Sequence, residues 1–180
     1  MIESTFSQEM MTAMGKRVLV AYVSKAGSTA EVAETIGATL RAAGLSADVR
    51  RAQEVKDLSA YDAVVLGSGA RIGRLFGGAA HFAKKHQAAL AQKKVAYFVV
   101  CMTMKQDTPQ NRETVKGYLA PLRQVCEPFS QGLFAGRMSL ETLGPVWRFF
   151  MRQSKPEDLG DFRNWDAIRA WAQEIAPALA

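Results

Sequence analysis

The chain has 180 residues, of which 48% are hydrophobic and 22% charged, and it contains two cysteines and two histidines. This composition is typical of a globular protein and gives no support to a disulfide framework or a zinc site. The longest apolar stretch, residues 95–104, falls well short of the roughly 20 residues that a membrane-spanning helix needs. Residues 1–15 carry no basic residue and no hydrophobic block. We therefore expect an N-terminal extension rather than a secretory signal, and a cytoplasmic location.

The net charge of +6 is unevenly distributed along the chain. Residues 71–155 contain 14 basic and 4 acidic residues, whereas the remainder contains 9 basic and 13 acidic residues. A basic segment of this kind favours an anionic ligand, an acidic protein or the negative surface of a membrane. A dispersed excess is also typical of a solvated surface. We expect no nucleic acid partner, because neither a recognition helix nor an aromatic platform is evident.

Buried strands and amphipathic helices alternate through the first half of the sequence. Residues 17–23 form an apolar run that is typical of a strand buried on both faces. Residues 28–43 place apolar side chains at helical spacing, and Gly44 follows at a natural C-terminal position. The same alternation then predicts a strand at 45–50, a strand at 61–67, a helix at 75–91 and a strand at 94–102.

The second half continues the pattern. It predicts a helix at 107–123, an irregular fifth strand within 125–136, an amphipathic segment at 140–153, a surface loop at 153–160 and a closing helix at 164–179. Asn164 is suited to the N-cap of the closing helix. The alternation predicts one α/β domain over residues 16–180, built on a five-stranded, doubly wound parallel sheet. Its ligand should lie beyond the carboxyl ends of the strands, where the strand order reverses.

The turn between the first strand and its helix is rich in small and hydroxyl-bearing residues. It consists of Ser24, Lys25, Ala26, Gly27, Ser28 and Thr29. Such a turn directs free backbone amides and the positive end of the helix dipole at one point, which predicts a phosphate site. A simple N-cap formed by Ser28 or Thr29 explains the same residues equally well. Neither a P-loop nor a dinucleotide-binding glycine pattern is present here.

Two further loops follow the third and fourth strands. The second loop, 67–73, includes Ser68, Gly69, Ala70, Arg71, Ile72 and Gly73, and the third comprises Cys101, Met102, Thr103, Met104 and Lys105. Glycines let the backbone approach a flat ligand, but ordinary turn chemistry also explains them, and core packing explains the methionines. Cys101 is more typical of a small buried hydrophobe than of a redox thiol. Together, three suitable loops at three successive strand ends predict one crevice.

These segments resemble the flavodoxin superfamily over residues 16–179. YVSKAGSTAEVA is similar to the loop that holds the FMN phosphate, VLGSGARIG to the loop beside the isoalloxazine ring, and VVCMTMK to the third flavin loop. Ala26 stands where the superfamily commonly has a hydroxyl residue, and neither ring-flanking loop contains Tyr or Trp. The resemblance implies a flavodoxin-like three-layer sandwich with strand order 2-1-3-4-5, and FMN bound by the residues of the three loops.

Within the superfamily, the sequence is similar to menaquinone-dependent protoporphyrinogen dehydrogenases. GARIGRLFGGAAHFAKKH and NWDAIRAWAQEIA carry this likeness. It implies an FMN enzyme that oxidises protoporphyrinogen or a related substrate and reduces a quinone, with the chemistry carried by FMN rather than by catalytic side chains. Aromatic and basic residues within 140–153 are consistent with peripheral membrane contact or with packing under the sheet. The alternatives are a flavodoxin-type electron carrier and a flavin-free binding module.

Overall fold

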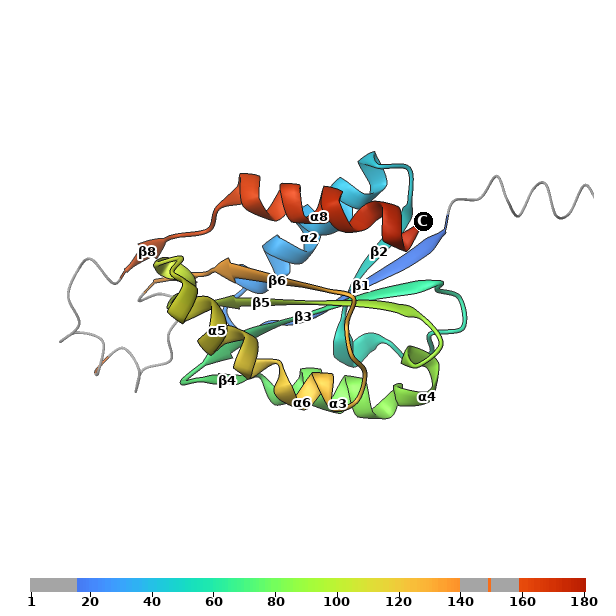
Figure 1. The fold of residues 1–180 in the computed structure, drawn as a ribbon, viewed down its shortest axis with the longest axis horizontal. Coiled ribbons are helices and arrows are strands. Elements are labelled where there is room, and N and C mark those ends of the chain that lie inside the picture. Colours follow the sequence, from blue (N-terminus) through green and yellow to red (C-terminus); the bar gives the residue numbers. More distant parts are fainter. Residues whose placement is uncertain (1–15, 140–148, 150–158) are drawn as a thin grey trace, which may run out of the picture.

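The computed structural model describes residues 16–139, 149 and 159–180. Figure 1 shows a central sheet between two layers of helices, which is the three-layer α/β architecture that the sequence predicts. The predicted extension at 1–15 and all but one residue of the predicted segment at 140–153 lie outside the described residues. No helix among the described residues combines the length and apolar character needed to cross a bilayer.

Five parallel strands form the core of the sheet. Their order is β2-β1-β3-β5-β6, which confirms the predicted order 2-1-3-4-5. The five strands are β1 (Arg17–Val23), β2 (Ser46–Arg51), β3 (Ala63–Arg71), β5 (Lys94–Cys101) and β6 (Ser130–Ala135). The sequence did not predict β4 (Arg74–Leu75), which pairs antiparallel with the end of β3. It also did not predict the small antiparallel ribbon of β7 (Arg137–Met138) and β8 (Gly160–Asp161).

Helices cover both faces of the sheet. One face carries α2 (Ser28–Ala42) and α8 (Trp165–Leu179), which lie side by side above the sheet in Figure 1. The other face carries α3 (Gly77–Lys85), α4 (Gln87–Leu90), α5 (Pro109–Tyr118) and α6 (Ala120–Arg123). Two short 3-10 helices complete the described elements: η1 (Ala52–Glu54) and η2 (Met102–Lys105).

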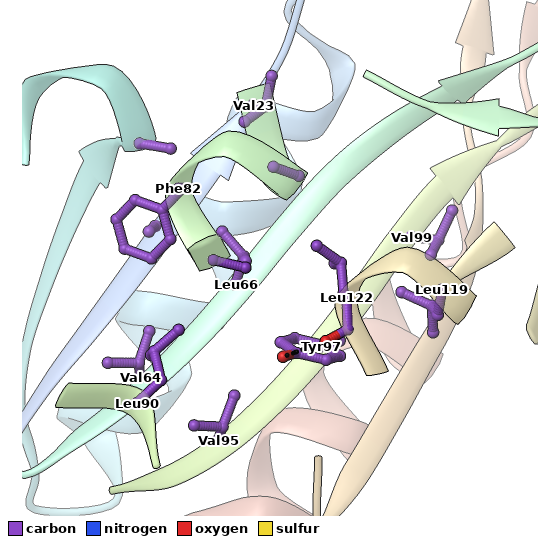
Figure 2. Close-up of a cluster of buried hydrophobic side chains, with 14 of the residues drawn as sticks. Val23, Val64, Leu66, Phe82, Leu90, Val95, Tyr97, Val99, Leu119 and Leu122 are labelled. Atoms are coloured by element: carbon purple, nitrogen blue, oxygen red, sulfur yellow. Dashed lines mark hydrogen bonds between the residues drawn. The ribbon is translucent and has the colours of Figure 1, made fainter. Parts of the chain in front are cut away.

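Each helical layer buries its own hydrophobic cluster against the sheet. Figure 2 shows the cluster under α3, α4 and α6, where Phe82, Leu90 and Leu122 pack onto strand residues such as Leu66 and Tyr97. On the opposite face, the rings of Phe98, Phe134 and Trp171 pack together with centroids 5.6–6.5 Å apart. Because adjacent strand residues point to opposite faces, Tyr97 belongs to the first cluster and Phe98 to the second.

The predicted glycine loop at 67–73 is in large part a strand, because β3 continues to Arg71. Gly67 and Gly69 lie within the sheet, where aromatic rings occupy the space that side chains would need. A Cβ atom at Gly67 would lie 1.9 Å from Cζ of Phe98, and one at Gly69 would lie 2.5 Å from Cε2 of Phe76. These glycines therefore allow close packing inside a strand rather than a turn.

Two predicted helices are divided in the structure, whereas the fifth strand lies within its predicted range, 125–136. The helix predicted at 75–91 divides at His86, whose φ of −106° and ψ of 18° leave the helical region. The helix predicted at 107–123 divides at Leu119, two residues before Pro121, which has no amide hydrogen to continue the helix. The fifth strand begins only at Ser130, because the amides of Val125 and Cys126 still bond the carbonyl of Leu122.

Candidate functional site: a pocket at the carboxyl edge of the sheet

A pocket of about 260 Å³ opens where β1, β3, β5 and β6 end. The structure brings all three predicted loop segments together around it, as expected for ends of neighbouring parallel strands. Of the predicted site residues, the pocket is lined by Ser24, Lys25, Ala26, Ser28, Thr29, Gly69, Ala70, Arg71, Ile72, Gly73, Cys101, Met102 and Thr103. Its size is close to the lower limit of about 300 Å³ that is common for small-molecule sites.

The first segment forms the N-terminus of α2. Gly27 is the N-cap, with a φ of 88° that favours glycine, and its amide donates a 3.0 Å hydrogen bond to Oγ of Ser24. No side chain caps this helix. In the part of the chain that the structure describes, no hydrogen bond occupies the amides of Ser28 and Thr29. The alternative in which Ser28 or Thr29 is merely the N-cap is therefore wrong, and the free amides suit an anion.

Lys25 extends the positive character of this end of the pocket. Its Nζ atom lies 5.0 Å from the ring centroid of Phe76, a cation–π contact that holds the ammonium group at the pocket wall. Phe76 is not among the predicted site residues. The signal that could have found it is an aromatic residue directly before the Gly77–Gly78 pair that begins α3.

The second segment supplies one wall through a hairpin. Ile72 and Gly73 form the turn between β3 and β4, and Ile72 is 78% exposed with a φ of 51°. A positive φ is unusual for a β-branched residue, and here the two-residue turn of the hairpin requires it, since Gly73 also has a positive φ of 71°. Ser68 was a predicted site residue, but it is buried beneath the pocket, where its hydroxyl donates to the carbonyl of Gly69.

The third segment contributes only its first three residues. Met104 is buried in the core, and Lys105 points toward the ring of Phe162, with 4.6 Å between Nζ and the ring centroid. Neither lines the pocket. Burial raises the pKa of the Cys101 thiol, which keeps it neutral at physiological pH. This agrees with the interpretation of Cys101 as a small buried hydrophobe.

Several lining residues are not among the predicted site residues. They are Phe76, Val100, Tyr118, Gly136, Arg137 and Met138. The hydroxyl of Tyr118 lies 3.4 Å from Oγ1 of Thr103, so this aromatic ring reaches the pocket from α5 rather than from one of the three predicted loop segments. The predicted strand order places the end of the fifth strand beside the fourth, so residues 136–138 could have been included on that ground.

The lining combines positive charge with apolar walls. Lys25, Arg71 and Arg137 are the charged residues among those that line the pocket in the described chain, and none of its lining residues is acidic. Ile72, Met102 and Tyr118 supply apolar and aromatic surface. Free amides at one end and apolar walls beside them fit a phosphorylated molecule with a flat ring system, and FMN has this character.

Comparison with known proteins agrees with this geometry. The model of the flavodoxin domain family matches residues 19–163, a range that includes all three predicted segments. Flavodoxin 1 from Bacillus cereus superposes with a TM-score of 0.57 at 17% identity, covering 91% of this chain and 99% of that protein. A flavoprotein from Lactobacillus acidophilus, solved in complex with FMN, gives a TM-score of 0.52 at 14% identity, covering 66% and 93%.

A curated relative has a named activity. Protoporphyrinogen IX dehydrogenase (quinone) from Escherichia coli strain K12 is 22% identical over 173 residues, which cover 89% of this chain and 94% of the relative. The similarity therefore extends over nearly the whole length of both proteins.

Proposed function

The chain belongs to the flavodoxin domain family, and we propose that it is an FMN-dependent oxidoreductase that oxidises protoporphyrinogen or a similar reduced substrate and passes the electrons to a quinone. Family membership supports FMN as the cofactor, as the resemblance to the flavodoxin superfamily implied. The observation that carries the proposal is the pocket itself, in which a helix N-terminus without a side-chain cap adjoins apolar walls at the reversal point of a doubly wound sheet.

In this proposal the amides of Ser28 and Thr29, with the hydroxyl of Ser24 and the ammonium of Lys25, hold the FMN phosphate. Residues Gly69, Ala70, Arg71, Ile72, Gly73, Met102 and Thr103 flank the ring system. Bound FMN supplies the electron transfer, and the protein supplies orientation and electrostatics. We assign no catalytic side chain. Cys101 is neutral and serves as part of the apolar wall.

Two observations support an anionic, porphyrinogen-like substrate. The E. coli relative acts, by its name, on protoporphyrinogen IX and a quinone. The charged groups that line the pocket in the described chain are all cations, and they would attract the carboxylates of such a substrate. The basic excess of residues 71–155 acts in the same direction at longer range.

The decisive experiment is an anaerobic turnover assay. Protein loaded with FMN is mixed with protoporphyrinogen and a menaquinone analogue, and porphyrin fluorescence is followed. We expect quinone-dependent porphyrin formation, and none with flavin-free protein from the same preparation. An FMN-loaded protein that forms no porphyrin above the flavin-free control would overturn the substrate assignment.

An electron carrier is the second candidate. The superposition covers 99% of the B. cereus flavodoxin, and the described residues of this chain form no further domain beside it. Such carriers usually present an acidic face to basic partners, whereas the pocket here is lined by cations. Bound FMN that exchanges electrons rapidly with a flavodoxin reductase, without protoporphyrinogen turnover, would favour the carrier.

A quinone acceptor dissolves in lipid, so the proposed function includes peripheral contact with a membrane. Residues 140–153 remain the segment proposed for it on sequence grounds, since they combine aromatic with basic side chains. Cosedimentation with anionic lipid vesicles tests this contact. The protein should pellet with the vesicles, and a protein that stays in the supernatant would contradict it.

A further inference from the structure

An ion-pair network joins the start of α2 to the β7–β8 ribbon. Glu31 lies in the first turn of α2 and is contacted by two arginines. Arg163 Nη1 donates to its Oε2 at 2.7 Å, and Nη2 of Arg137 lies 3.4 Å from its Oε1. Arg137 is also a lining residue of the pocket, so the network reaches the wall of the proposed FMN site.

Arg163 has a buried side chain that makes several polar and aromatic contacts, unlike an arginine in an exposed ion pair. Its side chain is only 3% exposed, and it donates two hydrogen bonds to Asp161, at 2.8 Å and 2.5 Å. Its guanidinium carbon also lies 4.4 Å from the ring centroid of Trp165. The neighbouring guanidinium lowers the pKa of Asp161, which keeps that carboxylate charged and the pair intact.

The position of Glu31 in the first turn of α2 means that its charge affects both the helix and a phosphate bound at the helix N-terminus. A carboxylate in the first turn stabilises a free helix, because it faces the positive end of the dipole. The same carboxylate repels a phosphate dianion that binds at that end. Two guanidinium groups on Glu31 offset this repulsion without removing the acidic residue from the helix.

We propose that Arg163, together with Arg137, neutralises Glu31 and thereby sets the preference of the pocket for a phosphorylated flavin over the same flavin without its phosphate. Arg163 is a positioning residue here, since it acts through Glu31 and lies outside the pocket lining. This inference rests on the proposed binding of FMN at the α2 N-terminus.

Other ion pairs of the described chain lack this arrangement. Arg169 pairs with Asp166 three residues away on α8, and the Asp166 side chain is 94% exposed. By contrast, Arg163 and Glu31 are separated by 132 residues, and their contact joins two elements at the pocket edge. Arg169→Gln therefore provides a matched control that removes a guanidinium from an ion pair elsewhere.

The test measures the dissociation constants of FMN and of riboflavin by quenching of flavin fluorescence. Arg163→Gln should weaken FMN binding about tenfold and leave riboflavin binding within about twofold, because only the phosphate meets the exposed charge of Glu31. Glu31→Gln in the same chain should restore FMN binding, whereas Arg169→Gln should change neither constant. The loss should shrink in concentrated salt.

The possible results distinguish failure of the proposed FMN binding from failure of the inference about Arg163. If the wild-type protein binds neither flavin, the proposed function fails. If it prefers FMN but Arg163→Gln keeps the same ratio of FMN to riboflavin affinity, or Glu31→Gln does not restore it, the inference fails. Should Arg163→Gln not fold, Arg137→Gln, with its more exposed side chain, is measured with and without Glu31→Gln, and the same pattern of loss and rescue is required.

Discussion

Single residues decide how closely the sheet and the pocket wall approach each other. The ring of Phe76 occupies the space above Gly69 and carries Lys25 on its face. Thr29 also contributes, because its Oγ1 would lie 3.0 Å from a Cβ atom at Gly69. Gly69 is therefore the point at which β3, the start of α2 and the pocket wall meet.

Replacing Gly69 with alanine should disturb β3, the start of α2 and the pocket wall. The added methyl must displace Phe76 and Thr29, so we expect a loss of about 1–3 kcal/mol in the free energy of unfolding and weaker FMN binding. Urea denaturation and flavin titration measure the two effects. Gly77→Ala is the control, since a Cβ atom there meets nothing within 4 Å, and it should change stability by less than about 1 kcal/mol. Equal behaviour of the two variants would contradict the packing argument.

His86 gives the protein a pH-dependent stability. Burial lowers its pKa below the ordinary 6.5, and its ring packs against Phe82 with centroids 4.7 Å apart. The unfolded chain therefore binds a proton more readily than the folded one. The stabilising contribution is complete above pH 6.5 and is lost as the pH falls through the folded pKa.

The prediction is that His86→Gln unfolds with a shallower pH dependence below pH 6.5 than the wild type, as measured by denaturation at a series of pH values. His81→Gln, an exposed position on α3, should retain the wild-type slope. If both variants keep that slope, the buried histidine is not its source.

At the scale of elements, the closing helix is the most predictable part of the structure. Asn164 was expected as its N-cap, and its Oδ1 accepts a 3.0 Å hydrogen bond from the amide of Ala167. We expect Asn164→Ala to cost about 1 kcal/mol of stability, whereas Asn164→Asp should retain most of it, because the aspartate also accepts this bond. Chemical denaturation compares them, and an alanine variant as stable as the aspartate variant would contradict the cap.

The alternation of strands and helices and the site of the first turn followed from local signals, namely apolar runs and helical spacing. The order of the strands in the sheet followed from the resemblance to the flavodoxin superfamily, and the Gly27 N-cap was not predicted. The extent of β3 did not follow from local signals, because the rings that cover Gly67 and Gly69 come from Phe98 and Phe76 elsewhere in the chain. Tyr118 was missed for the same reason, since its approach to Thr103 exists only in the folded protein. Local sequence patterns cannot reveal contacts of this kind.

For the whole molecule, we predict a bound flavin in the native protein. Freshly purified protein should be yellow, and acid should release FMN, with about one equivalent per chain when the protein is saturated. Chromatography of the released flavin identifies it, and absorbance gives the stoichiometry. Riboflavin or FAD in place of FMN would contradict the phosphate site at the start of α2.

A crystal structure of the FMN-loaded protein tests the proposed binding site most directly. We predict that the phosphate accepts hydrogen bonds from the amides of Ser28 and Thr29, with the ring system between the β3–β4 hairpin and the segment that begins at Met102. Electron density for FMN at any other place on the molecule, or a phosphate turned away from α2, would contradict it.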